Sequence, residues 1–423
     1  MTVARTLLDN GVAIVTERVP HLRSATVGIW VPVGSRVETP RDSGISHFIE
    51  HMLFKGTPRR RAIDISRAIE SVGGTMNAYT SREYTYFFAK AQEKDFPLVV
   101  DLLTDIYRNS LFDEEELSRE KGVILQEILM GDDTPEEYLH DFFNASYWGG
   151  HPLGLPVQGT AASVEGFDRE RLVSWFGGRF RRRGIGATVV GNLPHGAVVE
   201  SFGGALDSLP LKEPLRPVPP AEPVRGAFLK RRPLEQVHIC LGAPALPRNS
   251  GKIYAMDVLN AILGGSSSSR LFQQVREQRG LAYSVGSSIS AYADAGVLEV
   301  YAGTGREQAQ EVLSVAGGVV DDLQGGGVTE EEVAFGKELI KGNTLLSLES
   351  TGYRMSCLAV NEMFLDRLEP PEEILSRVEA VRPEEVRALA AWYTKGSDNG
   401  SQLRVAINHA ASLAELRALV EAF

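Results

Sequence analysis

Cysteine is scarce in this sequence, with only Cys240 and Cys357 among 423 residues. Two thiols build neither a disulfide framework nor a cysteine-rich zinc site. No apolar run approaches the ~18 residues that cross a membrane. The first ten residues have neither the apolar core of a signal peptide nor the Arg/Ser-rich pattern of a transit peptide. These absences predict a chain of the prokaryotic cytoplasm that makes no membrane contact.

Basic residues are also in the minority. The chain holds 44 Lys and Arg against 55 Asp and Glu, a formal net charge of −11. Such a balance argues against nucleic acid and anionic membranes as partners. A hydrophobic content of 43% with 23% charged residues is an ordinary globular composition. The length gives room for two or three domains.

The most informative stretch runs from His47 to His51 and reads His-Phe-Ile-Glu-His. It places two histidines one helical turn apart with Glu50 between them, the H-x-x-E-H order of the inverzincins. Between the turn residues 40–44 and Gly56, apolar residues at 45, 48, 49, 52 and 53 predict an amphipathic helix. The two histidines and the glutamate fall on its opposite face, which favours a metal-binding cleft over a solvated face.

Catalytic zinc needs three protein ligands and one open position. His47 and His51 supply two, and Glu50 is placed to reach a water rather than the metal, as a general base. A helix is predicted over 113–130, opened by a capping-box pattern, with Glu120 and Glu127 on one face. One of them could ligate zinc while the other orients a histidine. Both could equally be surface glutamates, and the spacing alone does not choose.

The chain contains one unit of about 210 residues used twice. Residues 210–223 include six prolines and predict a linker between an N-terminal zinc-binding domain, 1–209, and a C-terminal domain, 224–423. Each half reads as a helix ending in glycine, two alternating strands and a second helix. The first set is 65–73, 75–81, 85–91 and 97–107, and the second is 271–280, 282–291, 296–303 and 307–323. The fold class is therefore α+β, two homologous halves that each pack a mainly antiparallel sheet with helices.

The second copy serves as an internal control, because it lacks the metal ligands. Aligning Gly56 with Gly264 places apolar residues opposite the three positions of the motif, and Asn343 falls opposite Glu127 at an offset of 343 − 127 = 216. The apolar residues are Ala255, Val258 and Leu259. The fold evidently does not need histidine or glutamate at these places, so their presence in the first copy points to function.

With this helix, the distant glutamate pair and the duplicated halves, the chain resembles the pitrilysin/insulysin (insulinase) family of zinc peptidases. It is most similar to the short-chain branch that includes the mitochondrial processing peptidase and its bacterial relatives. Residues 47–57, HFIEHMLFKGT, resemble the family's zinc helix throughout. The family's Glu-x6-Glu pair matches residues 120–127, which implies that Glu127 is the third ligand of one Zn2+ per chain and that Glu120 supports the site. Gln126 departs from the family's usual acidic residue.

The resemblance also implies residues for the substrate. The stretch Asn77-Ala78-Tyr79 is similar to the family's edge strand, whose backbone pairs with an extended peptide. Phe54 and Tyr79 would line the pocket after the scissile bond. Arg276 and Tyr283 match an Arg-x6-Tyr pair that stabilises the oxyanion of the tetrahedral intermediate. Without the family, the same arginine is an ordinary last-turn cation and the tyrosine an ordinary strand residue.

Together these features predict a zinc metalloendopeptidase that cleaves extended peptides or unfolded segments. The alternative is a non-catalytic structural or peptide-binding subunit, a role that members of this fold also serve. Such subunits usually lack one or more ligands, whereas this chain has all of them. Some relatives divide the zinc motif and the Arg/Tyr pair between two subunits. Both are present here, which predicts a homodimer, with a heterodimer with a related chain as the alternative.

Overall fold

The computed structural model describes residues 2–215, 218–323, 327–365, 367–392 and 404–407. The chain divides into two compact units, each built from three separate segments. Unit 1 comprises Met1–Met130, Leu155–Pro219 and Ser347–Glu369. Unit 2 comprises Gly131–Gly154, Pro220–Leu346 and Pro370–Phe423.

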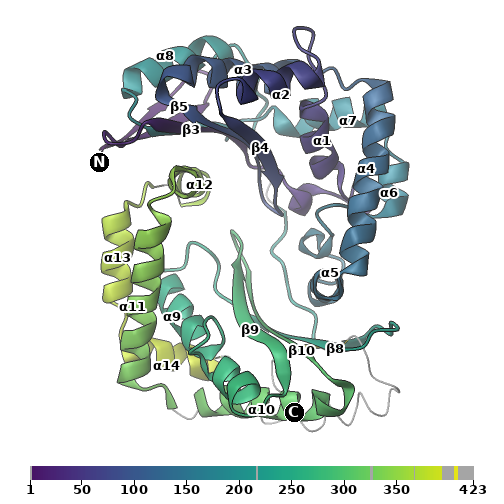
Figure 1. Cartoon of the computed structure of the whole chain (residues 1–423), viewed down its shortest axis with the longest axis vertical. Helices are drawn as coiled ribbons and strands as arrows, with labels where there is room; N and C mark the ends of the chain where they lie inside the picture. Colours follow the sequence, from purple (N-terminus) through teal and green to yellow (C-terminus); the bar gives the residue numbers. More distant parts are fainter. Residues whose placement is uncertain (1, 216–217, 324–326, 366, 393–403, 408–423) are drawn as a thin grey trace. The chain divides into compact units, whose positions relative to one another are not determined.

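Unit 1 is built on a six-stranded sheet with the order β1-β2-β6-β3-β5-β4. Strands β2 and β6 pair in parallel and the other neighbours are antiparallel. Strand β4 lies at one edge of the sheet (Figure 1). The strands are β1 (Thr2–Leu7), β2 (Ala13–Arg18), β3 (Ser24–Val31), β4 (Thr75–Thr80), β5 (Thr85–Gln92) and β6 (Gly186–Gly191).

Helices cover both faces of this sheet. Buried side chains of α1, α3 and α8 form the main core of the unit with one face of the strands. The opposite face is covered by α12, beneath β3 in Figure 1. The helices of the unit are α1 (Ile45–Leu53), α2 (Ala62–Glu70), α3 (Phe96–Asn109), α4 (Glu114–Asp133, which begins here), α6 (Ala161–Glu165), α7 (Arg169–Trp175), α8 (His195–Leu206) and α12 (Thr351–Phe364).

Unit 2 is built on a five-stranded sheet with the order β7-β11-β8-β10-β9. Its strands are β7 (Ala227–Leu229), β8 (Val237–Pro244), β9 (Ala282–Ala291), β10 (Gly296–Thr304) and β11 (Arg404–Ile407). Its helices are α5 (Pro135–Tyr147), α9 (Ile253–Leu263), α10 (Ala309–Asp322), α11 (Glu330–Ser347), α13 (Pro371–Glu379) and α14 (Pro383–Trp392). Across the described ranges, no helix combines the length and apolar character that spanning a bilayer requires.

Each sheet receives one helix from the other half of the sequence. On unit 1, α12 packs Met355, Leu358 and Ala359 against strand residues that include Trp30. A buried ion pair between Arg354 and Glu17, 2.6 Å long, pins this contact. On unit 2, α5 packs an aromatic face against β8 and β10. The exchange is reciprocal, since α5 comes from the first half of the chain and α12 from the second.

The predicted architecture of two homologous α+β halves is confirmed by the fold. The expected strands and helices form with shifts of a few residues at their ends, and β9 begins and ends where predicted. Gly73 and Gly280 both adopt positive φ, as helix-ending glycines do. The predicted division into 1–209 and 224–423 did not include the exchange of α5 and α12. Of the predicted linker, residues 216 and 217 lie outside the described residues, as does part of the 224–423 range.

Gly242 makes the close approach of α5 possible. It lies in β8 directly under Phe143, and a Cβ at this position would overlap the Phe143 ring. We expect Gly242→Ala to lower the free energy of unfolding by about 1–3 kcal/mol, because the ring must move out of a packed core. Gly251→Ala is the matched control, since nothing lies within 4 Å of its added Cβ. Thermal unfolding followed by circular dichroism compares the two, and equal midpoints would contradict the packing argument.

Candidate metal centre

The apolar face of α1 fixes the direction of its polar face. Ile45, Phe48, Ile49, Met52 and Leu53 are all fully buried in the core of unit 1. Of the four other positions, Ser46 is buried as well, while His47, Glu50 and His51 are turned away from that core and are partly accessible. Because 3.6 residues make one turn, the two histidines lie on the same side of the helix, with ring centroids 4.7 Å apart.

The first turn of α1 is capped by a distant carboxylate. Glu38 accepts hydrogen bonds from the backbone N–H groups of Gly44 (2.8 Å) and Ser46 (2.9 Å). Burial raises the pKa of Glu38 to about 7, although these hydrogen bonds act to lower it. The N-cap residue, Gly44, has a positive φ and no side chain, so the capping hydrogen bonds come from Glu38, which lies outside the helix.

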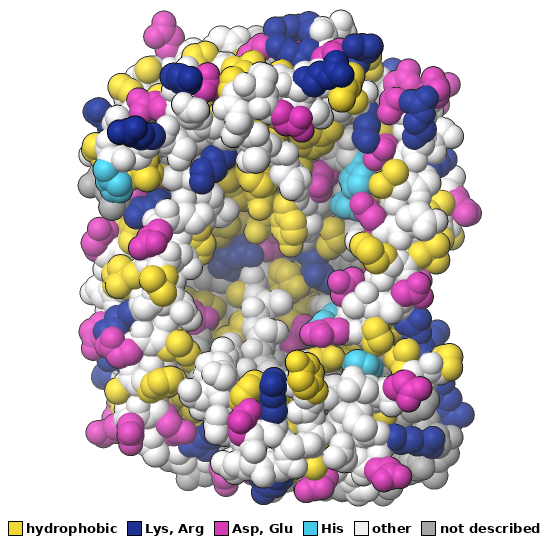
Figure 2. All heavy atoms as spheres, in the orientation of Figure 1, with side chains coloured by type: hydrophobic (Ala, Val, Ile, Leu, Met, Phe, Trp, Pro, Cys, Tyr) yellow, Lys and Arg dark blue, Asp and Glu magenta, His cyan; other side chains and the backbone are white. Residues whose placement is uncertain are grey.

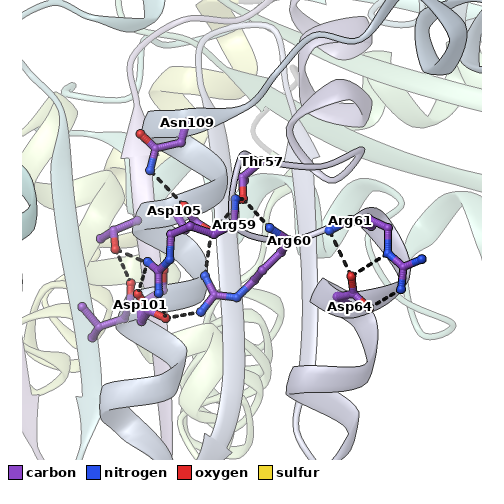
Figure 3. A network of polar contacts seen from close by, with 10 residues as sticks. Thr57, Arg59, Arg60, Arg61, Asp64, Asp101, Asp105 and Asn109 are labelled. Carbon is purple, nitrogen blue, oxygen red and sulfur yellow. Dashed lines mark hydrogen bonds and ion pairs between the residues drawn. The ribbon is translucent and has the colours of Figure 1, made fainter.

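The last turn of α1 is tied to α3. Ser110 donates to the carbonyl of Met52, and Gly56 adopts the positive φ expected of a glycine that ends a helix. After that glycine, Thr57 donates to the buried carboxylate of Asp105 at 2.9 Å, and Arg60 donates to the same oxygen at 2.6 Å (Figure 3). Both ends of the metal helix are therefore held by side chains from outside it.

Helix α4 brings the two glutamates to the same place. Asp113 caps it by accepting the backbone N–H groups of Glu115 and Glu116. The second half of the predicted capping box is missing, since the Glu116 carboxylate pairs with Arg119 instead. Leu117 and Ile124 are buried in the core of unit 1, which orients Glu120 and Glu127 towards α1.

Three ligand atoms converge between α1 and α4. The Glu127 Oε2 atom lies 3.8 Å from His47 Nε2 and 3.7 Å from His51 Nε2. The three residues form a cluster whose ligand atoms all lie within 4.8 Å of one another. On the face shown in Figure 2, histidine and acidic side chains adjoin each other over α1 and α4. Two imidazoles and one carboxylate are a ligand set that suits zinc with one open position.

Glu120 is not in this cluster but contacts one of its members. Its Oε2 atom lies 3.0 Å from His51 Nδ1 and its Oε1 atom 2.5 Å from Lys55 Nζ. Burial alone would raise the pKa of Glu120, but the hydrogen bonds to His51 and Lys55 outweigh it and hold the pKa below its usual range. Because Nδ1–H points at a carboxylate, His51 presents the lone pair of Nε2 to the cluster.

The protonation properties of the other groups fit a metal site. Burial, reinforced by the neighbouring His51, lowers the pKa of His47 to about 3, so its imidazole is neutral and able to ligate. Its Nδ1 is buried and has no hydrogen-bond partner among the described residues. Burial raises the pKa of Glu50, which accepts a hydrogen bond from Thr80. A carboxylate whose pKa is raised in this way is suited to accept a proton.

The predicted substrate residues lie on and beside β4. Asn77, Ala78 and Tyr79 are on this edge strand, and the Asn77 side chain accepts from the Ala78 N–H at 2.8 Å. Phe54 contacts Phe87, whereas Tyr79 contacts Tyr86, the next residue of β5. Successive strand residues point to opposite faces. The two rings therefore lie on different faces of the sheet, which corrects the expectation that they line one pocket.

Arg276 and Tyr283 meet in unit 2. Arg276 lies in a π-helical turn, Phe272–Glu277, and its guanidinium carbon is 4.8 Å from the ring centroid of Tyr283. The tyrosine is the second residue of β9 and is 78% exposed. The two side chains are thus in contact within unit 2, while the zinc ligands belong to unit 1. Their common action on one substrate stays a prediction.

Sequence reasoning missed three residues that support the site. Lys55 pairs with Glu120, Thr80 donates to Glu50, and Glu38 caps α1. Lys55 was detectable, because it follows His51 by one helical turn. Thr80 and Glu38 had no local signal, since their partners are 30 and 6 residues away. In the second copy Ala255, Val258 and Leu259 of α9 are buried in the core, as the internal control predicted.

The fold and the cluster together define the class of this protein. It is a chain of two homologous α+β halves, and the first half carries an H-x-x-E-H helix of the kind that binds a metal. The sequence matches the insulinase (peptidase family M16) domain over residues 13–161 and the peptidase M16 inactive domain over residues 166–340. The chain belongs to the insulinase family, peptidase family M16.

Similar sequences include proteins named as zinc proteases. It is 41% identical to an uncharacterized zinc protease of Streptomyces coelicolor, covering 92% of this chain and 86% of that one. It is 38% identical to the uncharacterized zinc protease YmxG of Bacillus subtilis, covering 92% and 95%. A protease from Helicobacter pylori has the same fold, with a TM-score of 0.88 at 20% identity over 97% of this chain and 99% of that one.

The two glutamates of α4 are expected to contribute unequally to metal binding. Glu127→Gln should lose most of the zinc because it removes a ligand atom, whereas Glu120→Gln should weaken binding by about 10–100-fold through the orientation of His51. Glu114→Gln, exposed in the first turn of the same helix, is the matched control. Zinc per chain after dialysis, measured by atomic emission, checks this. Wild-type zinc content in the Glu127 variant would refute the ligand assignment.

Proposed function

We propose that this protein is a zinc metalloendopeptidase that hydrolyses extended peptides or unfolded segments. The observation that carries this proposal is the convergence of His47, His51 and Glu127, with Glu50 between the two histidines on the same helix face. One Zn2+ per chain, held by these three residues, would supply a Lewis acid for a water molecule and for the scissile carbonyl.

Glu50 acts as the general base in this proposal. Its carboxylate is held by the Thr80 hydroxyl and its pKa is raised by burial, so it takes a proton from the attacking water more readily than an exposed glutamate. The same carboxylic acid then returns the proton to the leaving amine. Glu120 keeps His51 in the tautomer that ligates through Nε2.

The free edge of β4 is the proposed substrate platform. Within the part of the chain that the structure describes, β4 pairs only with β5, which leaves its other edge open for a peptide strand. Phe54 and Tyr79 would then contact alternate side chains of that peptide, because they lie on opposite faces. This arrangement supports a preference for extended, apolar segments.

Arg276 and Tyr283 are proposed to stabilise the oxyanion of the tetrahedral intermediate. Their side chains already adjoin in unit 2, and Tyr283 is exposed and so accessible to a substrate. We further propose that the chain acts as a homodimer in the prokaryotic cytoplasm. The zinc half of one chain would then serve with the Arg/Tyr half of its partner.

A non-catalytic subunit is the competing proposal. The description of the matched second domain as inactive supports it for that half alone. The first half retains the ligands and Glu50 together, and a merely structural role would not need the raised pKa of Glu50. Cleavage of a quenched peptide by the purified chain, with loss of cleavage on chelation, distinguishes the two.

Glu50→Gln is expected to keep zinc and fold but to lower kcat by at least about 10²-fold, because the amide cannot accept the proton. The measurement pairs zinc content with turnover of a quenched fluorescent peptide. Glu70→Gln, an exposed glutamate at the end of α2, is the control and should match wild type. Near wild-type turnover in the Glu50 variant would exclude it as the base.

Complementation tests the shared site. Glu50→Gln and Tyr283→Phe chains should each be inactive, and their mixture should regain part of the activity, since one site in a mixed dimer carries both intact groups. The tyrosine variant should keep its zinc, because it acts on the transition state. A mixture that stays inactive after subunit exchange is demonstrated would show that both groups come from one chain.

A further inference from the structure

The second sheet has a polar face beneath α5. Strand β8 alternates, with Val237, Ile239 and Leu241 directed into the helix-covered core. His238 and Cys240 therefore point to the other face. On β10, Glu299 and Tyr301 point to this face too, since Tyr301 pairs with Cys240 and Glu299 with Gly242. An imidazole, a thiol, a carboxylate and a phenol thus share one face of two adjacent strands.

Helix α5 adds a fifth polar group from above. Phe143 sits over Gly242, and one turn earlier His140 reaches the strands. Its Nδ1 lies 3.0 Å from Glu299 Oε2, and the same oxygen lies 3.9 Å from Cys240 Sγ. His140, Cys240 and Glu299 offer ligand atoms that all lie within 4.8 Å of one another.

Burial makes this trio unusual. Cys240 has no exposed surface and Glu299 has 5%, in a contact otherwise made by aromatic and aliphatic side chains. A carboxylate withdrawn from water at such a contact destabilises the fold unless it is compensated. A hydrophobic residue would pack between helix and sheet without that cost. The presence of an imidazole, a thiol and a carboxylate together is therefore explained by one ligand that all three bind.

We propose that His140, Cys240 and Glu299 bind a second metal ion, a divalent transition metal of the zinc type, independently of the cluster in unit 1. A thiolate with an imidazole and a carboxylate suits Zn2+ or Co2+ and disfavours the hard cations Ca2+ and Mg2+. Three protein ligands leave one position for water. The partly exposed His140 provides the way in, since its side chain is 34% accessible.

Metal binding here exchanges protons for the ion. Burial, with Glu299 nearby, raises the pKa of Cys240, so the thiol is protonated until a metal replaces the proton. The thiol proton then passes to solvent, and a neutral His140 would bind the ion through Nδ1 with its remaining proton on Nε2. Tyr301 is engaged elsewhere, with its hydroxyl 2.9 Å from His238 Nδ1.

The bound ion would hold the exchanged helix α5 in place. The ligands come from α5, β8 and β10, so the ion would join α5 to the sheet that it covers. Comparing the two halves of the sequence does not reveal this site, because α5 comes from the first half while β8 and β10 come from the second. It also needs only one cysteine, unlike the cysteine-rich sites that the composition excludes.

Cobalt titration of the metal-free full-length chain tests the proposal. Co2+ bound to a thiolate absorbs in the near ultraviolet, whereas Co2+ bound by two histidines and a glutamate does not. We expect wild type to bind two Co2+ per chain. Only one of the two bound ions should contribute to the thiolate band, and the band should disappear when Zn2+ replaces Co2+. The Glu127→Gln chain should bind one Co2+ and keep the full band.

Variants locate the band. Cys240→Ser and His140→Gln should lose it, and Cys357→Ser, which removes the other thiol, should keep it. Wild type and the Glu127 variant already suffice if the Cys240 variant fails to fold. No thiolate band in either of these two chains at saturating Co2+, or a band lost only in Cys357→Ser, overturns the proposal. Peptidase activity plays no part in this readout, so the two metal sites stand or fall separately.

Discussion

The burial of one face of α1 is the constraint on which the rest of the site depends. Five apolar side chains of a nine-residue helix are fully buried, which fixes the rotation of the helix about its own axis. Side chains on the opposite face then have no choice of direction. Each end is also held from outside, by Glu38 at the start and by Ser110 at the end. The precision of the ligand geometry is therefore a product of hydrophobic packing.

The electrostatics of the cluster are arranged before any metal arrives. His47 is kept neutral by burial, and His51 is oriented by Glu120, whose own charge is balanced by Lys55. Burial acts to lower the pKa of His51, but Glu120 and the other nearby carboxylates outweigh it and raise the pKa. The carboxylates that would attract a proton to His51 would equally attract a dication. Pre-organisation of this kind removes much of the reorganisation that binding would otherwise require.

The sequence was sufficient for features that repeat locally. The amphipathic period of α1, the spacing of Glu120 and Glu127, and the glycines that end α2 and its counterpart all lie within a few helical turns. The sequence could not predict contacts that no periodic pattern marks. The Glu38 cap lies only six residues from Gly44, the Thr80 hydroxyl lies 30 residues from Glu50, and His140 and Glu299 of the trio at α5 are 159 residues apart. The Phe54 and Tyr79 pocket failed for a related reason. Strand register decides which face a residue takes, and register depends on a partner strand.

The reciprocal exchange of α5 and α12 has a consequence for how the chain is made. As the ribosome releases the first half, the face of the unit 1 sheet that carries Trp30 and Val15 has no cover until residue 364 has emerged. The aromatic face of α5 likewise waits for β8 and β10. Neither unit can complete its packing as an independent nascent domain, so folding must be concerted over most of the chain. A message that ends early near the proline-rich segment would therefore yield an aggregation-prone fragment, with one face of the unit 1 sheet left without its covering helix.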